Sequence, residues 1–168
     1  MKKTISLLAL ATICCMLLSC DPSTYVIEDE TLSRVTCVEL IQYENTDQKH
    51  FVTWVPDQFE ELVPFELSRA TVLETLPAEK TSAFLEAFSK TYILHTYYAY
   101  NSPKDVCLRL RYENGDFLIV WANYAEHSHA GYIGEYASDG SVLSFWGSFS
   151  ALSEYENLVY EYFAYDLT

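Results

Sequence analysis

The chain has 168 residues, half of them hydrophobic, and carries a formal net charge of −14 at neutral pH. That length suits about one domain with its own hydrophobic core. A surface this acidic repels phosphate backbones, so nucleic acid is excluded from the expected partners.

The first 19 residues have the organisation of an export signal. Lys2 and Lys3 precede an apolar stretch from Ile5 to Leu18, which is too short for a membrane span of about 20 residues. The stretch closes with Leu17-Leu18-Ser19-Cys20. An ordinary secretory signal is the alternative, but its peptidase prefers an A-x-A-like site, which is absent near residue 20.

This arrangement resembles the signal peptide and lipobox of bacterial lipoproteins. The resemblance implies that residues 1–19 are removed, that Cys20 receives a diacylglyceryl lipid, and that the protein lies on the extracytoplasmic face of a cell membrane. Two or more acyl chains hold a protein stably at a bilayer. The remaining chain has eight basic and 24 acidic residues, a formal charge of −16, which repels anionic headgroups.

The part after the signal divides into a tether and one domain. Residues 20–34 are polar and acidic without a sustained period, and we expect them to be a tether. A single domain is expected over residues 35–168. Its first strand is predicted at Val35–Tyr43, where β-branched residues are frequent, with a weaker strand at 50–55 and another at Ala70–Thr75.

A helix is predicted directly after these strands. Pro77 is tolerated in a first helical turn, and Glu79 is favourable to the helix dipole there. The helix is expected to end near Lys90. One apolar stripe follows helical spacing and must cover a flat apolar surface such as a sheet: Thr81, Phe84, Leu85 and Phe88.

The C-terminal half predicts two consecutive hairpins and a helix. Val106–Tyr112 alternates strictly, and Asn114-Gly115 is a strong turn signal before the apolar run Phe117–Trp121. The second hairpin comprises Gly131–Tyr136, the turn Asp139-Gly140 and Val142–Phe149. Ser153 with Glu156 fits a helix capping box. The apolar face of that helix is Leu152, Tyr155, Val159, Tyr162 and Phe163.

Together these elements predict an α+β fold. We expect an antiparallel sheet of about six to eight strands, ending in a double-hairpin meander, with two helices packed on one face. The layout, including the stretch from Cys107 to Phe117, resembles small uncharacterised lipoproteins of Gram-positive bacteria. That resemblance implies no particular activity.

Two cysteines and two arginines are candidates for special roles. Cys37 and Cys107 could form a disulfide in an exported chain, or remain two thiols, one or both of them buried. The alternation places Cys107 on the same side as Arg109 and Arg111, which does not suit a buried thiol. The arginines are expected to pair with glutamates across the sheet, or alternatively to grip an anion.

Histidines supply a metal hypothesis. His127 and His129, with Glu126 beside them, would point to the same side of a strand. Zinc requires a third protein ligand, however, and a loop is expected just before Gly131. The metal-dependent envelope hydrolase is therefore kept as the alternative function, and an exposed polar loop as the simpler interpretation.

Aromatic residues are the one compositional excess, at 15% of the chain, and 14 of them are tyrosines. Tyr97, Tyr98 and Tyr100 are close together and are candidates for a binding surface, because tyrosine offers apolar area plus a hydroxyl. The alternative is that these rings fill the core. No assembled catalytic motif or cofactor-binding motif is present in the sequence. We therefore expect a non-enzymatic binding domain without a cofactor, whose partner is an envelope protein or a small ligand.

Overall fold

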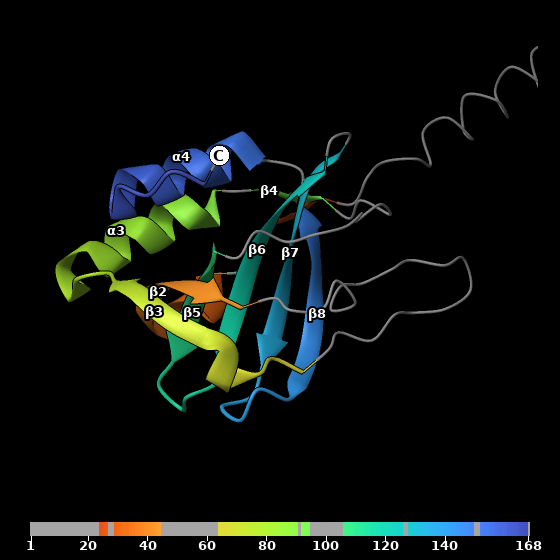
Figure 1. Cartoon of the computed structure of the whole chain (residues 1–168). Coiled ribbons are helices and arrows are strands. Elements are labelled where there is room, and N and C mark those ends of the chain that lie inside the picture. Colours follow the sequence, from red (N-terminus) through yellow and green to blue (C-terminus); the bar gives the residue numbers. More distant parts are fainter. Residues whose placement is uncertain are drawn as a thin grey trace, which may run out of the picture.

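The structure is a computed structural model, which describes residues 24–26, 29–44, 64–90, 92–94, 106–125, 128–149 and 152–167. These residues form a six-stranded antiparallel sheet with two long helices on one face (Figure 1). This confirms the predicted α+β class and the C-terminal double-hairpin meander. The strands are β1 (Thr24–Val26), β2 (Val35–Tyr43), β3 (Ala70–Thr75), β4 (Tyr92–Leu94), β5 (Val106–Tyr112), β6 (Phe117–Ala125), β7 (Ser128–Tyr136) and β8 (Val142–Phe149). The helices are α2 (Asp29–Ser33), the single 3-10 turn η1 (Leu67–Arg69), α3 (Ala78–Ser89) and α4 (Leu152–Phe163).

The strand order in the main sheet is β3-β2-β5-β6-β7-β8. Strands β5 to β8 are neighbours in both sequence and space, as short turns between antiparallel strands require. The N-terminal part of the fold inserts β2 beside β5, which leaves β3 at one edge of the sheet. A separate pair is formed by β1 and β4.

One face of the sheet is covered by α3 and α4, which lie side by side over it (Figure 1). Alternating strand residues supply this core because successive side chains in a strand point to opposite faces. Phe84 packs against Tyr162 and Phe163 of α4, with ring centroids 5.3 and 6.1 Å apart. The strand residues of this core include Val38, Leu40, Leu108, Leu110, Leu118 and Val120.

The opposite face, here called the second face, is buried as well. Its core comprises Ile41, Tyr43, Phe65, Cys107, Phe117, Ile119, Trp121 and Tyr136. An antiparallel sheet commonly leaves one face in water, but here residues 64–66, the covering segment, lie against it. The Phe65 N–H donates a hydrogen bond to the Gly140 carbonyl oxygen at 2.8 Å. Burial of both faces of the sheet explains why the run Phe117–Trp121 is apolar at successive positions.

The predicted tether over residues 20–34 is not irregular throughout, because residues 24–26 form β1, which pairs with β4. Asp29–Ser33 form α2, and Leu32 is only 4% exposed within the helix-side core. Burying one leucine side chain contributes roughly 1.5–3 kcal/mol, which favours packing of this short helix against the fold. The domain therefore begins before residue 35. The strand predicted at 50–55 lies outside the described residues.

Candidate functional site

The second face carries a cluster of charged side chains from β2 and β5. Glu39 lies directly opposite Arg109 in the register, and Cys37 lies opposite Arg111. The Arg109 Nε donates to Oε2 of Glu39 at 2.7 Å, and the Arg111 Nε is 3.5 Å from the same oxygen. This confirms the predicted pairing of both arginines across the sheet, with a single glutamate serving both.

Burial separates the roles of the two arginines. The side chains of Glu39 and Arg109 are 6% and 13% exposed, whereas that of Arg111 is 47% exposed. A hydrogen bond with the Cys37 side chain, assisted by the Glu39 charge, raises the pKa of Arg111 against the opposing effect of its burial. Arg109 is thus committed to Glu39 as a structural ion pair. Arg111 remains a candidate for binding.

Of the two alternatives for Cys37 and Cys107, the structure has two separate thiols and no disulfide between them, with Cys107 buried. Cys37 is opposite Arg111 and Cys107 is opposite Ile41, an offset of about 13 Å along the strands. A disulfide requires Cα atoms within about 7 Å.

The expectation that Cys107 is not buried is wrong, because that thiol is 0% exposed. The covering segment and its neighbours close over the second face there. This burial raises the pKa of the Cys107 thiol well above its ordinary value, against a smaller opposing effect of Arg109. A buried thiol with a raised pKa is a poor nucleophile.

Several candidates named from the sequence lie in parts of the chain that the structure does not describe. Cys20, Tyr97, Tyr98, Tyr100 and His127 lie outside the described residues. The backbone of His129 is in β7, opposite Tyr124, while its side chain is not described. Within the described ranges, no group of three metal-ligating side chains occurs. The metal hypothesis therefore stays a prediction.

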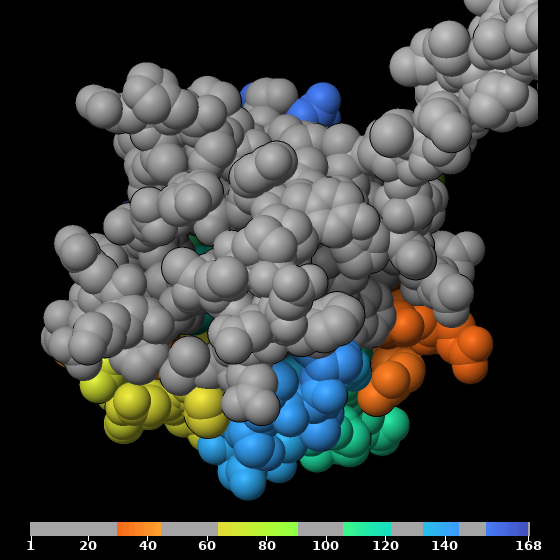
Figure 2. Space-filling view, turned by 90° about the vertical axis from the view of Figure 1, so that its right-hand side faces the viewer, coloured from red at the N-terminus to blue at the C-terminus, as the bar shows by residue number. Residues whose placement is uncertain are grey.

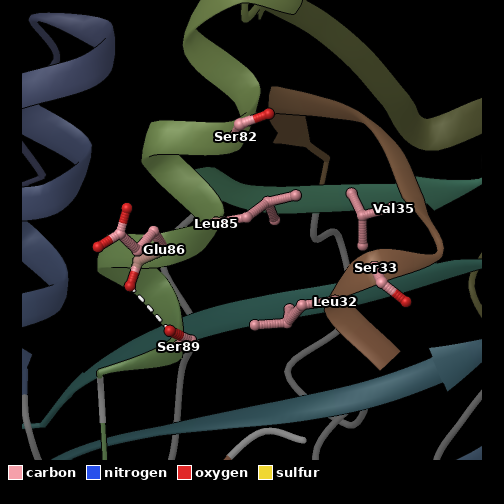
Figure 3. A pocket seen from close by; sticks show the side chains of 7 residues that line it. All are labelled: Leu32, Ser33, Val35, Ser82, Leu85, Glu86 and Ser89. Carbon is pink, nitrogen blue, oxygen red and sulfur yellow. Dashed lines mark hydrogen bonds between the residues drawn. The ribbon is translucent and has the colours of Figure 1, made fainter. Parts of the chain in front are cut away.

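A groove of about 360 Å³ lies between α2 and α3. Leu32, Val35 and Leu85 form its apolar part, and Figure 3 shows the two leucines pointing into the space between the helices. Glu86 points away from α2 in this view, and Ser89 donates its hydroxyl to the Glu86 carbonyl oxygen at 2.8 Å. The described residues that line the groove therefore offer apolar area and hydroxyls, and none of them directs a charged group into it.

A wider hollow of about 550 Å³ lies on the other side of Ser33. Its cation, Arg34, stacks over the Tyr112 ring with the guanidinium carbon 4.2 Å from the centroid. Its amide, Asn114, is 2.6 Å from the Asp116 carboxylate, and Glu113 adds a negative charge to the lining. Because Arg34 and Asn114 already interact with neighbouring side chains, few polar groups remain to bind a small ligand.

A different kind of site occurs at the edge of the sheet. Three large hydrophobic side chains are exposed there, on η1 and β3: Leu67 at 39%, Val72 at 42% and Leu73 at 41%. Within the described part of the chain, only Leu143 and Tyr160 are further exposed side chains of this kind. We call Leu67, Val72 and Leu73 the η1–β3 surface. Figure 2 shows the segment that contains it, drawn in yellow, at the molecular surface.

Strand β3 is unusual because residues pointing to either face of the sheet are exposed. Every residue from Thr71 to Thr75 is exposed, and Ala70 is half-buried. The register shifts at this strand, so that Glu74 pairs with Leu40 while Val72 pairs with Ile41. Leu73 is therefore the extra residue of a β-bulge.

Sequence reasoning predicted this strand but missed its surface. The only available signal was the pair Val72-Leu73, because adjacent apolar residues in a strand cannot both point into one core. Here neither is buried.

No protein-family model, curated protein or solved structure matches this chain. The described part of the chain also has no helix that is long and apolar enough to cross a membrane.

Proposed function

We propose that the protein is a lipoprotein, anchored through Cys20 at the extracytoplasmic face of a cell membrane, and that it acts there as a non-enzymatic domain binding a partner polypeptide. The observation that carries the binding function is the η1–β3 surface, where three exposed apolar side chains occur on an edge strand and the 3-10 turn directly before it. Contiguous exposed apolar area is a feature of interaction sites, whereas scattered apolar side chains are not.

The shape of this surface favours a polypeptide over a small molecule. Small-molecule sites are concave and bury most of the ligand, whereas β3 is a projecting edge whose residues are exposed on both faces. The buried Glu39 and Arg109 side chains are paired with each other and so offer no free acid or base, which is consistent with a binding role.

Charge favours a basic partner. The chain after residue 19 has a formal charge of −16, and the η1–β3 surface has Glu66 and Glu74 within its own segment, both exposed. Arg69 offsets Glu66 through an ion pair of 2.9 Å. Glu74 has no ion-pair partner among the residues that the structure describes. Complementary charge raises the association rate and excludes like-charged partners.

Substitution of the anchor cysteine tests the proposed location. In a bacterial host that processes lipoproteins, Cys20→Ser is expected to abolish incorporation of labelled palmitate and to release the chain from the membrane fraction, because the acyl chains supply the membrane affinity. Cys37→Ser is the control and is expected to retain the label. Mass spectrometry that finds an unmodified amino terminus on the wild-type chain would contradict the anchor.

Site-specific photo-crosslinking in cells tests the proposed binding surface. A benzophenone amino acid at Leu73 is expected to form a discrete covalent adduct with a polypeptide, because this position lies in the proposed interface. The same probe at Tyr160, an exposed residue of α4, is the control. Leu67→Ser should weaken the Leu73 adduct severalfold. Identical adducts from positions 73 and 160 would contradict the η1–β3 surface as the binding site.

A further inference from the structure

We infer that β3 binds its partner by strand addition, in which an extended basic segment of the partner pairs with the backbone of residues 70–72. This inference rests on the proposed function and specifies how the η1–β3 surface works. It adds a requirement that apolar contact alone does not have, namely that main-chain hydrogen bonds are formed at the sheet edge.

The register between β2 and β3 shows which backbone groups point outward. The Glu44 N–H donates to the Arg69 carbonyl oxygen at 3.0 Å, immediately beyond the pair Tyr43–Ala70. Opposite residues of an antiparallel pair alternate between hydrogen-bonded and non-hydrogen-bonded positions. Thr71 is therefore bonded to Gln42, whereas the N–H and C=O of Val72 point away from β2.

Ala70 adds one further outward group beside Val72. The Ala70 N–H is engaged with the Leu67 carbonyl oxygen, so Ala70 presents its C=O to the edge. Together with the N–H and C=O of Val72, this gives an incoming strand three main-chain groups to pair with. Val72 is 42% exposed, which leaves room for a strand to approach.

The bulge sets the limit of the pairing site. Leu73 is inserted where the register changes between Leu40 and Ile41, and a bulge locally disrupts the ladder and bends the strand. Residues 70–72 thus form a short pairing site that ends at the bulge. Leu67 and Leu73 lie at its two ends and supply the apolar contacts.

The negative charge of the chain indicates which kind of strand binds at the edge of β3. Two copies paired edge to edge would bring together two formal charges of −16, and natural edge strands use charge and bulges to prevent such pairing. A lysine- or arginine-bearing segment instead gains attraction, with Glu74 exposed near the end of the site. The occupant is therefore a basic, extended segment of a different polypeptide.

The test uses the purified full chain in detergent micelles and a short synthetic peptide of alternating lysine and valine. Val72→Pro removes the outward N–H but no bond to β2, and proline is tolerated at such an edge position. It is expected to weaken peptide binding about tenfold or more. Val72→Thr keeps the N–H and the β-branched shape, and is expected to bind within about twofold of wild type. Hydrogen exchange at the Val72 amide should slow when the peptide is bound.

Three further measurements complete the test. A peptide with N-methylated alternate amides should bind about tenfold more weakly to the unchanged protein, which covers the case in which Val72→Pro fails to fold. Equal binding by Val72→Pro and Val72→Thr, or by the methylated peptide, overturns strand addition. If binding is equal but Leu67→Ser still weakens it, the η1–β3 surface remains a binding site that acts through side chains. If Leu67→Ser has no effect either, the proposed function is contradicted as well. Sedimentation that finds a dimer broken by Val72→Pro would make a second copy the occupant and overturn the inference.

Discussion

Replacing Gly140 by alanine is expected to lower the free energy of unfolding by about 3 kcal/mol or more, through left-handed backbone strain and overpacking. Gly140 has φ +88°, a conformation that costs a residue with a Cβ about 1–2 kcal/mol. A Cβ there would also press on the carbonyl group of Phe65, which is backbone and cannot rotate away. The loss would appear as a fall in melting temperature of about 6–12 °C.

Gly115→Ala is the matched control for this prediction. Gly115 has nearly the same backbone angle, φ +90°, but its nearest neighbour would be the Ser138 Cβ at 3.2 Å. A shift of a few tenths of an ångström relieves that contact, so mainly the conformational cost of about 1–2 kcal/mol is expected. Thermal unfolding of both variants separates the two effects. Equal losses would mean that contact between the β7–β8 turn and the covering segment has no energetic importance.

Replacing Glu39 by glutamine is expected to lower the free energy of unfolding by about 3–5 kcal/mol, the usual loss when one member of a buried ion pair is removed. The substitution keeps the shape of the side chain but removes the charge that Arg109 contacts at 2.7 Å. Arg109, 13% exposed, would then be a nearly buried cation without a counterion. Denaturant unfolding monitored by circular dichroism measures the loss.

An exposed ion pair on α3 provides the control for Glu39. Glu86 contacts Lys90 at 3.0 Å, with both side chains more than 70% exposed, and Glu86→Gln is expected to cost less than about 0.5 kcal/mol. Combining Glu39→Gln with Arg109→Gln should recover part of the stability, since no unpaired cation would then remain beside Phe117. A loss below 1 kcal/mol for Glu39→Gln, or no recovery in the double variant, would contradict the assignment of a structural pair.

Local patterns predicted the elements and the faces of the sheet, but not what covers each face. The alternation in Val106–Tyr112 correctly separates Leu108 and Leu110 from Arg109 and Arg111. It cannot reveal that Cys107 is buried, because the residue that closes over that face is Phe65, distant in the sequence and in a segment without periodicity. Burial of a strand's second face is decided by such non-local packing.

Non-local pairing likewise decides where the candidate site lies in the sheet. The residues of β3 predicted a strand, yet its position at the edge depends on β2 pairing with β5 across a long stretch of sequence. Pairing of Arg109 with some glutamate was predictable from strand chemistry. The identity of Glu39 was not, because it follows from the register, which a shift of one residue would change.

The pairing of β1 with β4 bears on how closely the proposed lipid anchor would hold the protein at a membrane. Thr24 is the first residue of that pairing, opposite Leu94, and only four peptide links separate it from Cys20. Four extended residues reach at most about 14 Å. A lipid on Cys20 would therefore act through a short tether. It would keep the acidic domain close to the headgroups and restrict its orientation relative to the membrane.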